Sequence, residues 1–310
     1  MAVHEIPWQA AFPEECRRGA LTIGNFDGVH RGHAALLGLL REEARRANGP
    51  AVALTFDPHP VCLLHPERCP PALTTPADRA EWIQACGADQ VLMLRIDGDM
   101  LRLTAAEFFE QIVRTKLDPR AMIEGGNFGF GRNREGNTET LAGLCEQAGI
   151  RFATAPPVMW DGQAISSSRV RAALQLGAVA EAASLLGRPY RLHGVVGRGQ
   201  RRGQTLGFPT ANLEQIPNLI PGDGVYAAKV KVEGDSWPGA ANIGPNPTFG
   251  ENARKVEMHL IGFRGDLYDQ ALSVDFLDRL RDTRKFKSAD DLTAQLRVDV
   301  EQARRIAEGK

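Results

Sequence analysis

Residues 20–33 read ALTIGNFDGVHRGH and connect an apolar run to an amphipathic pattern through a turn that contains glycine. The run Ala20–Ile23 predicts a buried strand, and the apolar spacing over residues 34–47 predicts a helix that begins directly after the turn. A strand that leads through such a turn into a helix is typical of a βαβ unit, whose strands lie parallel in one sheet. Ligands of parallel sheets bind at the carboxyl ends of the strands, so residues 24–33 are expected to lie at a binding site.

The alternation of strand and helix patterns continues to about residue 186. Thr104-Ala-Ala-Glu107 has the sequence of a capping box and predicts the start of one helix, and Gly149 predicts the end of another. These patterns predict an α/β domain over residues 1–186, with a parallel sheet and helices on both faces. The further runs that predict strands are 51–56, 90–94, 121–124 and 151–155.

The character of the sequence changes near Gly187. Glycine, proline and short alternating runs then dominate, which is typical of an antiparallel sheet closed into a small barrel. Ser288-Ala-Asp-Asp291 predicts the start of a closing helix that continues through about Ala307. The chain is therefore predicted to have a second, all-β domain over residues 187–310.

The 310 residues are balanced in charge, because 37 Lys and Arg against 38 Asp and Glu give a formal net charge of −1. A protein dedicated to nucleic acid normally has a clear excess of basic residues, so a nucleic-acid partner is not expected. No apolar run approaches the roughly 18 residues that a membrane span needs, and the N-terminus lacks the pattern of a signal peptide. These observations predict a two-domain cytoplasmic protein that contacts no membrane, and they give no oligomeric state.

The five cysteines are odd in number and form no C-x-x-C pair. This spacing argues against a disulfide framework and against a zinc site, and it suits a reducing compartment. Two of the cysteines fall within predicted helices, where a buried thiol acts as a small apolar side chain. The five positions are Cys16, Cys62, Cys69, Cys86 and Cys145.

Two imidazoles, His30 and His33, flank Gly32 at the predicted start of the first helix. Residues three apart in a helix lie on the same side, so both rings can face a ligand at the helix N-terminus. Gly32 lets a ligand approach the backbone, and the free N–H groups of a helix start bind anionic oxygens. This arrangement suits the α-phosphate of a nucleotide, whose charge has to be stabilised as pyrophosphate leaves. For one histidine alone, a helix cap is the simpler interpretation.

Three further motifs lie in the first predicted domain. Ile165-Ser-Ser-Ser-Arg-Val-Arg171 supplies hydroxyls and arginines for a second phosphate contact, although a serine cap with a solvated basic face explains it equally well. Thr55-Phe-Asp-Pro-His-Pro60 is a weaker signal, because Asp-Pro and His-Pro also end strands. Gly125-Gly-Asn-Phe-Gly-Phe-Gly131 predicts either an aromatic slot for a flat ring or a packed turn.

The second predicted domain contains GVVGRGQRRGQTLGFPTAN at residues 194–212. Its glycines and three arginines predict a basic loop around phosphates in preference to a loop that contacts RNA. The Thr210 hydroxyl and the Asn212 amide oxygen are hard donors of the kind that bind Mg²⁺ together with nucleotide phosphates.

In Lys255-Val-Glu-Met-His-Leu260 the alternation of a strand places Glu257 and His259 on one face. A carboxylate beside a phosphate loop is a candidate general base, which could take the proton of a substrate hydroxyl as it attacks a γ-phosphate. An isolated glutamate is more often a salt-bridged surface residue. His259 is ambiguous, and a satisfied core histidine is the favoured interpretation.

In their order and spacing, the motifs of the first domain resemble the adenylyltransferase half of bacterial bifunctional riboflavin kinase/FAD synthetase. The resemblance implies a Rossmann-like nucleotidyltransferase domain that transfers AMP from ATP to FMN. It implies that His30 and His33 stabilise the α-phosphate and that Ser168 and Arg169 grip the triphosphate. Gly129 departs from the larger, often basic, residue that the family has at this place. The resemblance further implies Gly24, Phe26 and Gly32 on the ATP side and Asp57, Asn127, Phe128 and Phe130 on the flavin side.

The second domain resembles the riboflavin kinase half of the same family. The resemblance implies a six-stranded Greek-key barrel with a C-terminal helix, which phosphorylates the 5′-hydroxyl of riboflavin. It implies that Glu257 is the base, that Thr210 and Asn212 bind Mg²⁺, and that Arg281 lies at the flavin. Gln204 stands where the family more often has arginine. The matching strings are GQTLGFPTAN (203–212), PGDGVY (221–226), NIGPNPTF (242–249), VEMH (256–259) and FRGDLY (263–268), and the implied ATP-covering residues are Gly199, Arg201, Gly203, Gly207 and Thr210.

The sequence thus predicts an enzyme that converts riboflavin and ATP into FMN, and FMN and a second ATP into FAD. Mg²⁺ is the expected cofactor, and riboflavin, FMN and ATP are the expected small-molecule partners. One alternative is a riboflavin kinase whose first domain is an inactive scaffold. Another is a flavin- or RNA-binding regulatory protein without ATP turnover, which the paired histidines and the serine-arginine motif argue against.

Overall fold

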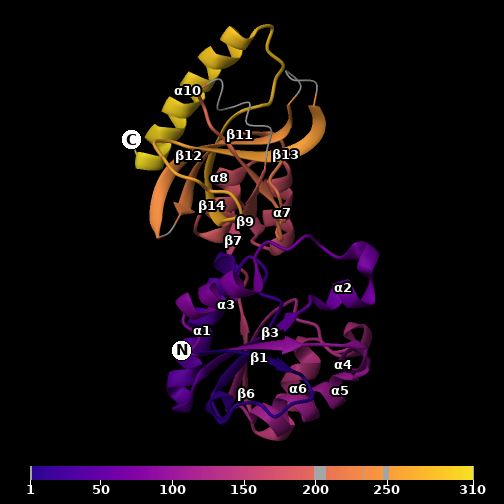
Figure 1. Ribbon diagram of the computed structural model, residues 1–310. Helices are drawn as coiled ribbons and strands as arrows, with labels where there is room; N and C mark the ends of the chain where they lie inside the picture. The colour runs from indigo at the N-terminus through magenta and orange to yellow at the C-terminus, as the bar shows by residue number, and fades with distance from the viewer. Residues whose placement is uncertain (1, 199–206, 233, 247–250, 310) are drawn as a thin grey trace. The chain divides into compact units, whose positions relative to one another are not determined.

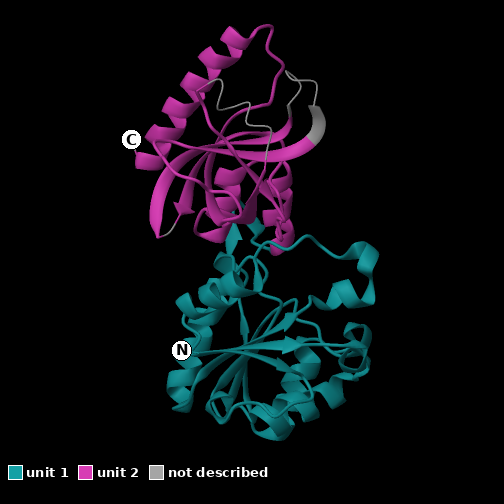
Figure 2. Ribbon diagram, viewed as in Figure 1, with its two compact units in different colours: residues 1–166 teal, residues 167–310 magenta. Residues whose placement is uncertain are grey.

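The computed structural model describes residues 2–198, 207–232, 234–246 and 251–309 (Figure 1). The chain forms two compact units, residues 1–166 and residues 167–310 (Figure 2). The first unit is α/β and the second contains a closed antiparallel barrel, so both predicted fold classes are confirmed. No helix in the described part of the chain is both long enough and apolar enough to cross a membrane.

Unit 1 is built on a six-stranded sheet in which every paired neighbour is parallel. Its strand order is β1-β4-β3-β2-β5-β6. From β2 the sheet is extended in one direction by β3, β4 and β1 and in the other direction by β5 and β6. The sheet therefore has its topological switch point between β2 and β5, where parallel sheets bind ligands. The edge strand β1 is not apparent from the sequence patterns. The strands are β1 (Ala2–Pro7), β2 (Ala20–Ile23), β3 (Ala51–Asp57), β4 (Gln90–Arg95), β5 (Ala121–Gly125) and β6 (Arg151–Ala155).

Helices cover both faces of this sheet because its central strands are apolar on both sides. Leu37 and Ile83 pack on one face with the alanines of the central strands, whereas Ile112 and Leu141 pack on the other face with their leucines. The Thr104 capping box and the Gly149 helix end are both confirmed. The helices are α1 (Arg31–Ala47), α2 (Pro60–Leu64), α3 (Pro76–Ala85), α4 (Gly98–Arg102), α5 (Ala105–Phe108), the π-helical η3 (Phe109–Leu117) and α6 (Thr138–Ala148).

Unit 2 begins with two helices, α7 (Ser167–Gln175) and α8 (Val179–Leu186). α8 contacts barrel strands, and α7 contacts α8. These contacts explain why the compact unit begins before the boundary near residue 187 that the change in sequence character indicates.

The barrel of unit 2 has six strands, all paired antiparallel, in the closed order β10-β13-β12-β11-β14-β9. Alternate residues of β9 are buried, as expected for a strand with one face toward the interior of a barrel. Helix α10 (Ala289–Glu308) packs Ala303 against Ala227 and Ile261 on the outside of the barrel. The strands are β9 (Tyr190–Gly197), β10 (Ala211–Glu214), β11 (Gly224–Val232), β12 (Asp235–Asn246), β13 (Glu251–Leu260) and β14 (Ala271–Arg281).

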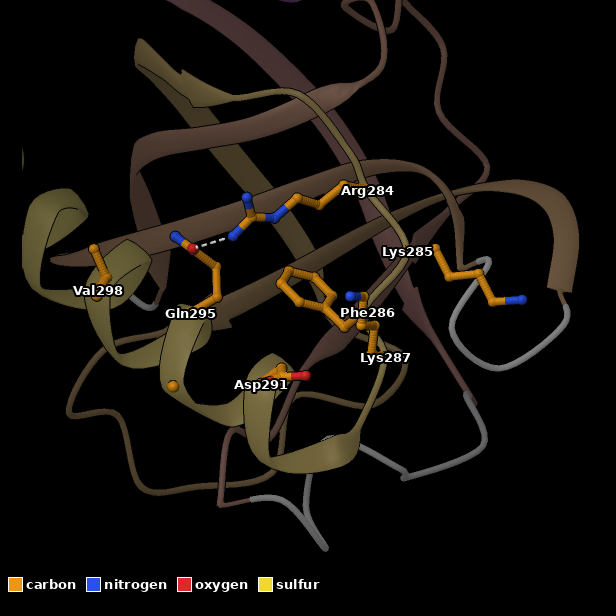
Figure 3. Close-up of a pocket in the computed structure, with 8 residues that line it drawn as sticks. Arg284, Lys285, Phe286, Lys287, Asp291, Gln295 and Val298 are labelled. Atoms are coloured by element: carbon orange, nitrogen blue, oxygen red, sulfur yellow. Dashed lines mark hydrogen bonds between the residues drawn. The ribbon is translucent and has the colours of Figure 1, made fainter.

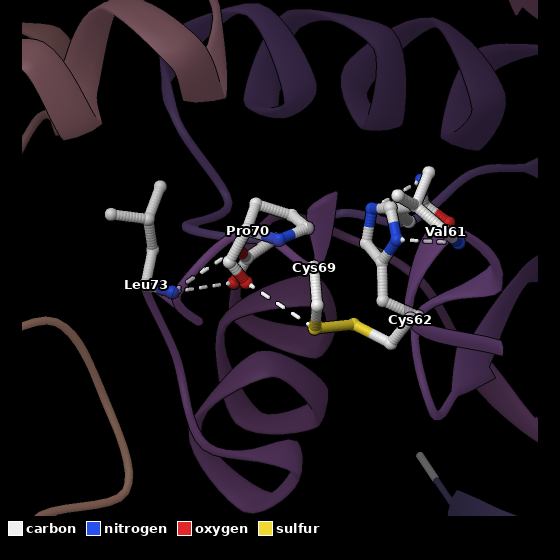
Figure 4. Close-up of a disulfide and its surroundings, with 8 residues drawn as sticks. Val61, Cys62, Cys69, Pro70 and Leu73 are labelled. Carbon is white, nitrogen blue, oxygen red and sulfur yellow. Dashed lines mark hydrogen bonds between the residues drawn. A yellow bond between two sulfur atoms is a disulfide. The ribbon is translucent and has the colours of Figure 1, made fainter. Parts of the chain in front are cut away.

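The expectation that the cysteines form no disulfide is wrong for one pair, because Cys62 and Cys69 are bonded (Figure 4). Helix α2 and the short 3-10 turn η2 (Pro66–Arg68) fold the chain back on itself, so the Cα atoms of the two cysteines are 4.4 Å apart. A separation of seven residues gives no C-x-x-C signal in the sequence. Of the other cysteines, Cys16 and Cys145 are buried thiols, and burial raises their pKa values to about 12 and about 11.

Candidate active sites

The turn after β2 is held in an unusual backbone conformation. Phe26, Gly28 and Val29 all have positive φ values, of 47°, 86° and 39°. The Phe26 ring is buried below Gly24, where an added Cβ would come within 3.2 Å of the ring. Strain of this kind in non-glycine residues persists only where the surrounding structure fixes it.

His30 and His33 lie together at the N-terminus of α1. His30 caps the helix, because the backbone N–H of His33 donates to its Nδ1 at 3.3 Å. The two rings are stacked, with centroids 3.7 Å apart and planes 14° apart, and Phe26 meets His33 edge-on. A nitrogen that accepts a hydrogen bond carries no proton, so neutral His30 has its proton on Nε2 and can donate from there.

Gly32 is required by this stack. A Cβ at residue 32 would lie 3.0 Å from Cε1 and 3.1 Å from Nδ1 of the His30 ring. The glycine therefore leaves space for the histidine ring, in addition to any room that it gives a ligand.

Asp27 connects the turn to a distant segment of the chain. Its buried carboxylate accepts hydrogen bonds from the backbone N–H groups of Leu73 and Thr74 and from the Thr74 hydroxyl, at 3.0–3.1 Å. These hydrogen bonds hold the turn against the segment that leads into α3.

Glu124 lies at the switch point, and sequence reasoning did not single it out. β2 and β5 pair only at Ala20–Ala121 and Leu21–Met122, and beyond them the backbone N–H of Ile23 donates to Glu124 Oε1 at 2.7 Å. Burial raises the pKa of this carboxyl well above its usual range. A single carboxylate inside the apolar run AMIEG was the signal in the sequence.

The segment Thr55–Pro60 is connected to the histidine turn through Asn25. The Thr55 hydroxyl donates to the Asn25 carbonyl at 3.1 Å, and Nε2 of His59 lies 2.9 Å from the Asn25 amide. Arg79 donates to the Phe56 carbonyl at 2.8 Å, and burial lowers its pKa. Asp57 ends β3 at the same edge of the sheet, so the structure brings these two sequence motifs together.

The glycine-rich segment after β5 lines an apolar pocket of about 150 Å³. The Phe128 and Phe130 rings are stacked, with centroids 5.5 Å apart and planes 18° apart, and Phe108 is tilted against Phe130. Asn127 lies beside this pocket and contributes a backbone carbonyl that accepts from Arg134. The lining residues are Ile23, Phe56, Pro60, Leu64, Ile96, Met100, Leu101, Phe108, Phe128, Gly129, Phe130, Gly131, Asn133 and Arg134.

Ser168 and Arg169 lie in the first turn of α7 and therefore belong to unit 2. The Arg169 guanidinium is 3.7 Å from the Glu181 carboxylate of α8, and its side chain is largely buried. This ion pair holds the arginine against the neighbouring helix.

On the barrel, strand register places Glu257 between two asparagines. Asn212 of β10 lies opposite Glu257 of β13, and Asn242 of β12 lies opposite it on the other side. Opposed residues of neighbouring strands point to the same face, so the three polar side chains form a row. Met258 is fully buried inside the barrel, which places the row on the outer face. The same register continues through Val225 of β11 to Arg281 of β14.

His259 holds the segment that contains Thr210. Nδ1 of His259 lies 2.8 Å from the Pro209 carbonyl, and the ring meets Phe208 edge-on. The ring of His259 is therefore hydrogen-bonded, as expected, but it is only partly buried and does not belong to the core. The contact holds residues 208–210 beside β13. Gly207 has a φ of 82° and Thr210 is exposed, whereas the predicted phosphate-loop residues Gly199, Arg201, Gly203 and Gln204 lie outside the described residues.

Arg281 is held at the end of β14 by a buried partner. It forms a two-pronged ion pair with Asp299 of α10, at 3.0 Å from Nε and 2.7 Å from Nη2. Its guanidinium also lies over the Phe286 ring, 5.6 Å from the ring centroid, and Arg284 lies 5.0 Å from the same centroid. Two guanidinium groups therefore lie close to one aromatic ring at this end of the row.

An open pocket of about 440 Å³ lies next to this aromatic stack (Figure 3). Arg284 donates to Gln295 across it at 2.6 Å. The pocket combines one aromatic ring with several basic side chains, which suits a flat ligand that bears oxygen or phosphate groups. Its lining residues are Arg284, Lys285, Phe286, Lys287, Asp291, Ala294, Gln295 and Val298.

Comparison with known proteins links each unit to one activity. A family model described as FAD synthetase matches residues 12–169, and one described as riboflavin kinase matches residues 186–307. Proteins named bifunctional riboflavin kinase/FMN adenylyltransferase are similar over 90% or more of the chain. The one from Pseudomonas fluorescens is 40% identical over 94% of this chain and 94% of its own length, and the one from Bacillus subtilis is 33% identical over 94% and 93%.

A solved structure titled as a macrolide-efflux protein from Streptococcus pneumoniae is 31% identical, with a TM-score of 0.88 over 98% of this chain and 99% of its own. That similarity extends through both units of the fold. With two family models in the expected order and relatives above 30% identity over nearly the full length, the chain belongs to the family of bifunctional riboflavin kinase/FMN adenylyltransferases.

Proposed function

We propose that this protein makes FAD from riboflavin in two ATP-dependent steps at two separate sites. Residues 187–310 phosphorylate riboflavin to FMN, and residues 1–186 transfer AMP from a second ATP to FMN. The observation that supports this proposal best is that each unit contains its own polar constellation. The stacked histidine pair lies at the switch point of the sheet, and the Asn212–Glu257–Asn242 row lies on the barrel.

In the kinase step, Glu257 accepts the proton of the riboflavin 5′-hydroxyl while that oxygen attacks the γ-phosphorus of ATP. The bond from the γ-phosphorus to the β-bridging oxygen breaks, and ADP leaves. The flanking amides of Asn212 and Asn242 orient the carboxylate. Gly199, Arg201, Gly203 and Gly207 of the basic loop cover the ATP phosphates, and Arg281 with Phe286 forms the flavin side.

A divalent ion, Mg²⁺, fits the oxygen donors beside Glu257. Within the described residues no cluster of three or more histidine, cysteine or carboxylate side chains could hold a metal by itself. The Thr210 hydroxyl and the Asn212 amide oxygen are neutral hard donors, so they suit an ion that also takes ligands from phosphate. When bound, the ion would neutralise charge on the phosphates.

In the adenylyl step, a phosphate oxygen of FMN attacks the α-phosphorus of ATP, and the bond to the pyrophosphate leaving group breaks. No protein nucleophile is needed, because positioning and electrostatics are sufficient for in-line phosphoryl chemistry. His30 donates from Nε2, and His33 and the N–H groups of α1 face the same developing charge. Gly24, Phe26 and Gly32 shape this ATP side, and Ser168 and Arg169 grip the triphosphate.

The aromatic pocket of unit 1 receives the flavin ring in this proposal. Phe128 and Phe130 supply the flat apolar surface, and Asp57 and Asn127 supply polar groups at its edge. Riboflavin, FMN and ATP are therefore the proposed partners. We place the reactions in the cytoplasm, with neither nucleic acid nor a membrane as a partner.

The test is a chromatographic time course of purified protein with ATP and Mg²⁺, started once from riboflavin and once from FMN. FMN should appear from riboflavin and then decline as FAD forms, and FAD should form directly from supplied FMN. FMN that accumulates without FAD from either start would support the alternative of a kinase with an inactive first domain. Flavin binding without ATP consumption would reject both enzymatic readings.

A further inference from the structure

The pocket around Phe128 and Phe130 has a single charged side chain among the described residues that line it, and that residue is Arg134. Its floor is buried and apolar, with Phe108 and Phe130 each less than a tenth exposed. Arg134 itself is exposed, so its guanidinium lies at the mouth of the pocket. A ligand for this pocket therefore combines an apolar ring with a group that a cation binds.

The chain makes room for Arg134 at Gly129. A Cβ at residue 129 would lie 2.9 Å from Nε and from Nη2 of Arg134, so the guanidinium rests directly on the glycine backbone. Nη2 also donates to the Asn127 carbonyl at 3.1 Å. A larger residue at position 129 would have to displace this arginine. The cation at this rim therefore comes from residue 134.

The loop that presents Arg134 is closed by several contacts. Phe130 and Gly136 exchange two backbone hydrogen bonds of 3.0 Å, and Glu135 accepts from the backbone N–H of Ala105 at 2.9 Å. Asn133 and Arg134 both have positive φ values, of 54° and 58°. Left-handed backbone at two consecutive non-glycine residues is costly, and the closing contacts maintain it.

The guanidinium of Arg134 has donors left for a ligand. Across the described part of the chain it makes one hydrogen bond, to Asn127, and no ion pair. A guanidinium has five N–H donors in a planar fork, which matches two oxygens of a phosphate. Its neighbour Arg132 is different, because it lies 3.9 Å from the Glu135 carboxylate and does not line the pocket.

We propose that Arg134 selects FMN over riboflavin at the adenylyl-transfer site by binding the phosphate of FMN. This inference rests on the proposed function. The two flavins share the ring that an apolar pocket recognises, and they differ in a phosphate that is absent from riboflavin. Riboflavin bound in this pocket lacks the phosphate oxygen that attacks the α-phosphorus of ATP, so it would block the second step. A cation at the mouth favours the anionic flavin and thereby reduces this inhibition by the substrate of the first step.

The test uses the full chain with Glu257→Gln, so that added riboflavin is not phosphorylated. In this background the Michaelis constant for FMN and the inhibition constant of riboflavin are measured from FAD formation. Arg134→Ala should raise the Michaelis constant for FMN about ten- to a hundredfold, which is the range expected for a lost charge-assisted hydrogen-bond pair. The inhibition constant of riboflavin should stay unchanged. Arg134→Lys should give an intermediate value, and Arg132→Ala is the matched control, expected to change neither.

Two results would overturn the inference. One is an unchanged Michaelis constant for FMN in Arg134→Ala. The other is an equal rise of the Michaelis constant for FMN and the inhibition constant of riboflavin. That result would mean that the arginine contacts the flavin ring, which both ligands share. Failure of the proposed function itself is distinguishable, because the parent enzyme would then form no FAD from FMN.

Discussion

The two units build their candidate sites in opposite ways. In unit 1 the histidine pair, the capped helix and the strained turn all come from residues 20–33, one continuous stretch. On the barrel, Asn212, Glu257 and Arg281 are far apart in the chain and come into one row only through strand register. A local site can be recognised from sequence and disturbed by small steric changes. A site built by strand register depends on the closure of the barrel, and substitution of one side chain in it can abolish the reaction.

If the two sites are separate, Glu257→Gln should stop FMN formation and spare FMN adenylylation. The amide keeps the shape of the side chain but cannot accept the proton, and loss of a general base costs about 10²- to 10⁴-fold in rate. Each rate is measured alone, with riboflavin or with FMN as the flavin. Equal loss of both activities would contradict the division into two sites.

The reciprocal change is the double substitution His30→Ala and His33→Ala. Because these rings face the charge that develops on the α-phosphate, their loss should lower FAD formation from FMN about 10²- to 10³-fold. The rate of riboflavin phosphorylation by the same preparation is the control and should stay at its original value. Undiminished FAD formation would remove the histidines from the mechanism.

A smaller change tests whether steric fit alone maintains the local site. Gly32→Ala places a methyl group 3.0 Å from the His30 ring and should reduce adenylyl transfer about tenfold by shifting the stack. The matched control is Gly38→Ala in the same helix, where an added Cβ meets nothing within 4 Å. Alanine has a higher helix propensity than glycine by up to about 1 kcal/mol, so helix propensity should not lower the thermal stability of either variant. Equal activities in the two variants would contradict the steric argument.

The substitution of Glu124 tests stability and not activity, and its effect depends on pH. Its pKa is raised in the folded protein by burial, so its neutral form is favoured there, and its contribution to stability is complete below about pH 4.5 and declines as pH rises. Glu124→Gln does not titrate and retains an acceptor for the Ile23 amide. Its free energy of unfolding should therefore improve relative to the parent between about pH 5 and pH 8, by at most about 1.4 kcal/mol per pH unit. Denaturant unfolding of both proteins at the two pH values checks this, and a constant difference would contradict it.

The parts of the fold that follow from local sequence were predictable. The strand at residues 20–23, the helix after it, the Thr104 capping box and a small closed barrel with its closing helix all agree with the structure. Their signals are hydrophobic period, caps and turn residues, which act over a few positions. For the same reason the H-x-G-H motif predicted that His30 and His33 lie together at a helix start, as the structure shows.

The features that were missed depend on contacts between distant residues. Asn242 joins Glu257 through strand register, and Arg281 is fixed by Asp299 of the closing helix. The Cys62–Cys69 disulfide depends on how α2 and η2 fold the chain back. Glu124 acts where two strands diverge. None of these partners lies within the few residues over which periodicity and caps give information.

The barrel closes by pairing β9, its first strand, with β14, its last. On the ribosome, residues 20–136, which contain the histidine pair and the aromatic pocket, are synthesised before β9 begins at residue 190. Domains of a growing chain tend to fold in the order in which they are made. The barrel that phosphorylates riboflavin can therefore close only after residue 281 and the helix that follows have been synthesised. A chain that is truncated late in synthesis would lose the first reaction, although that reaction precedes the other in the pathway.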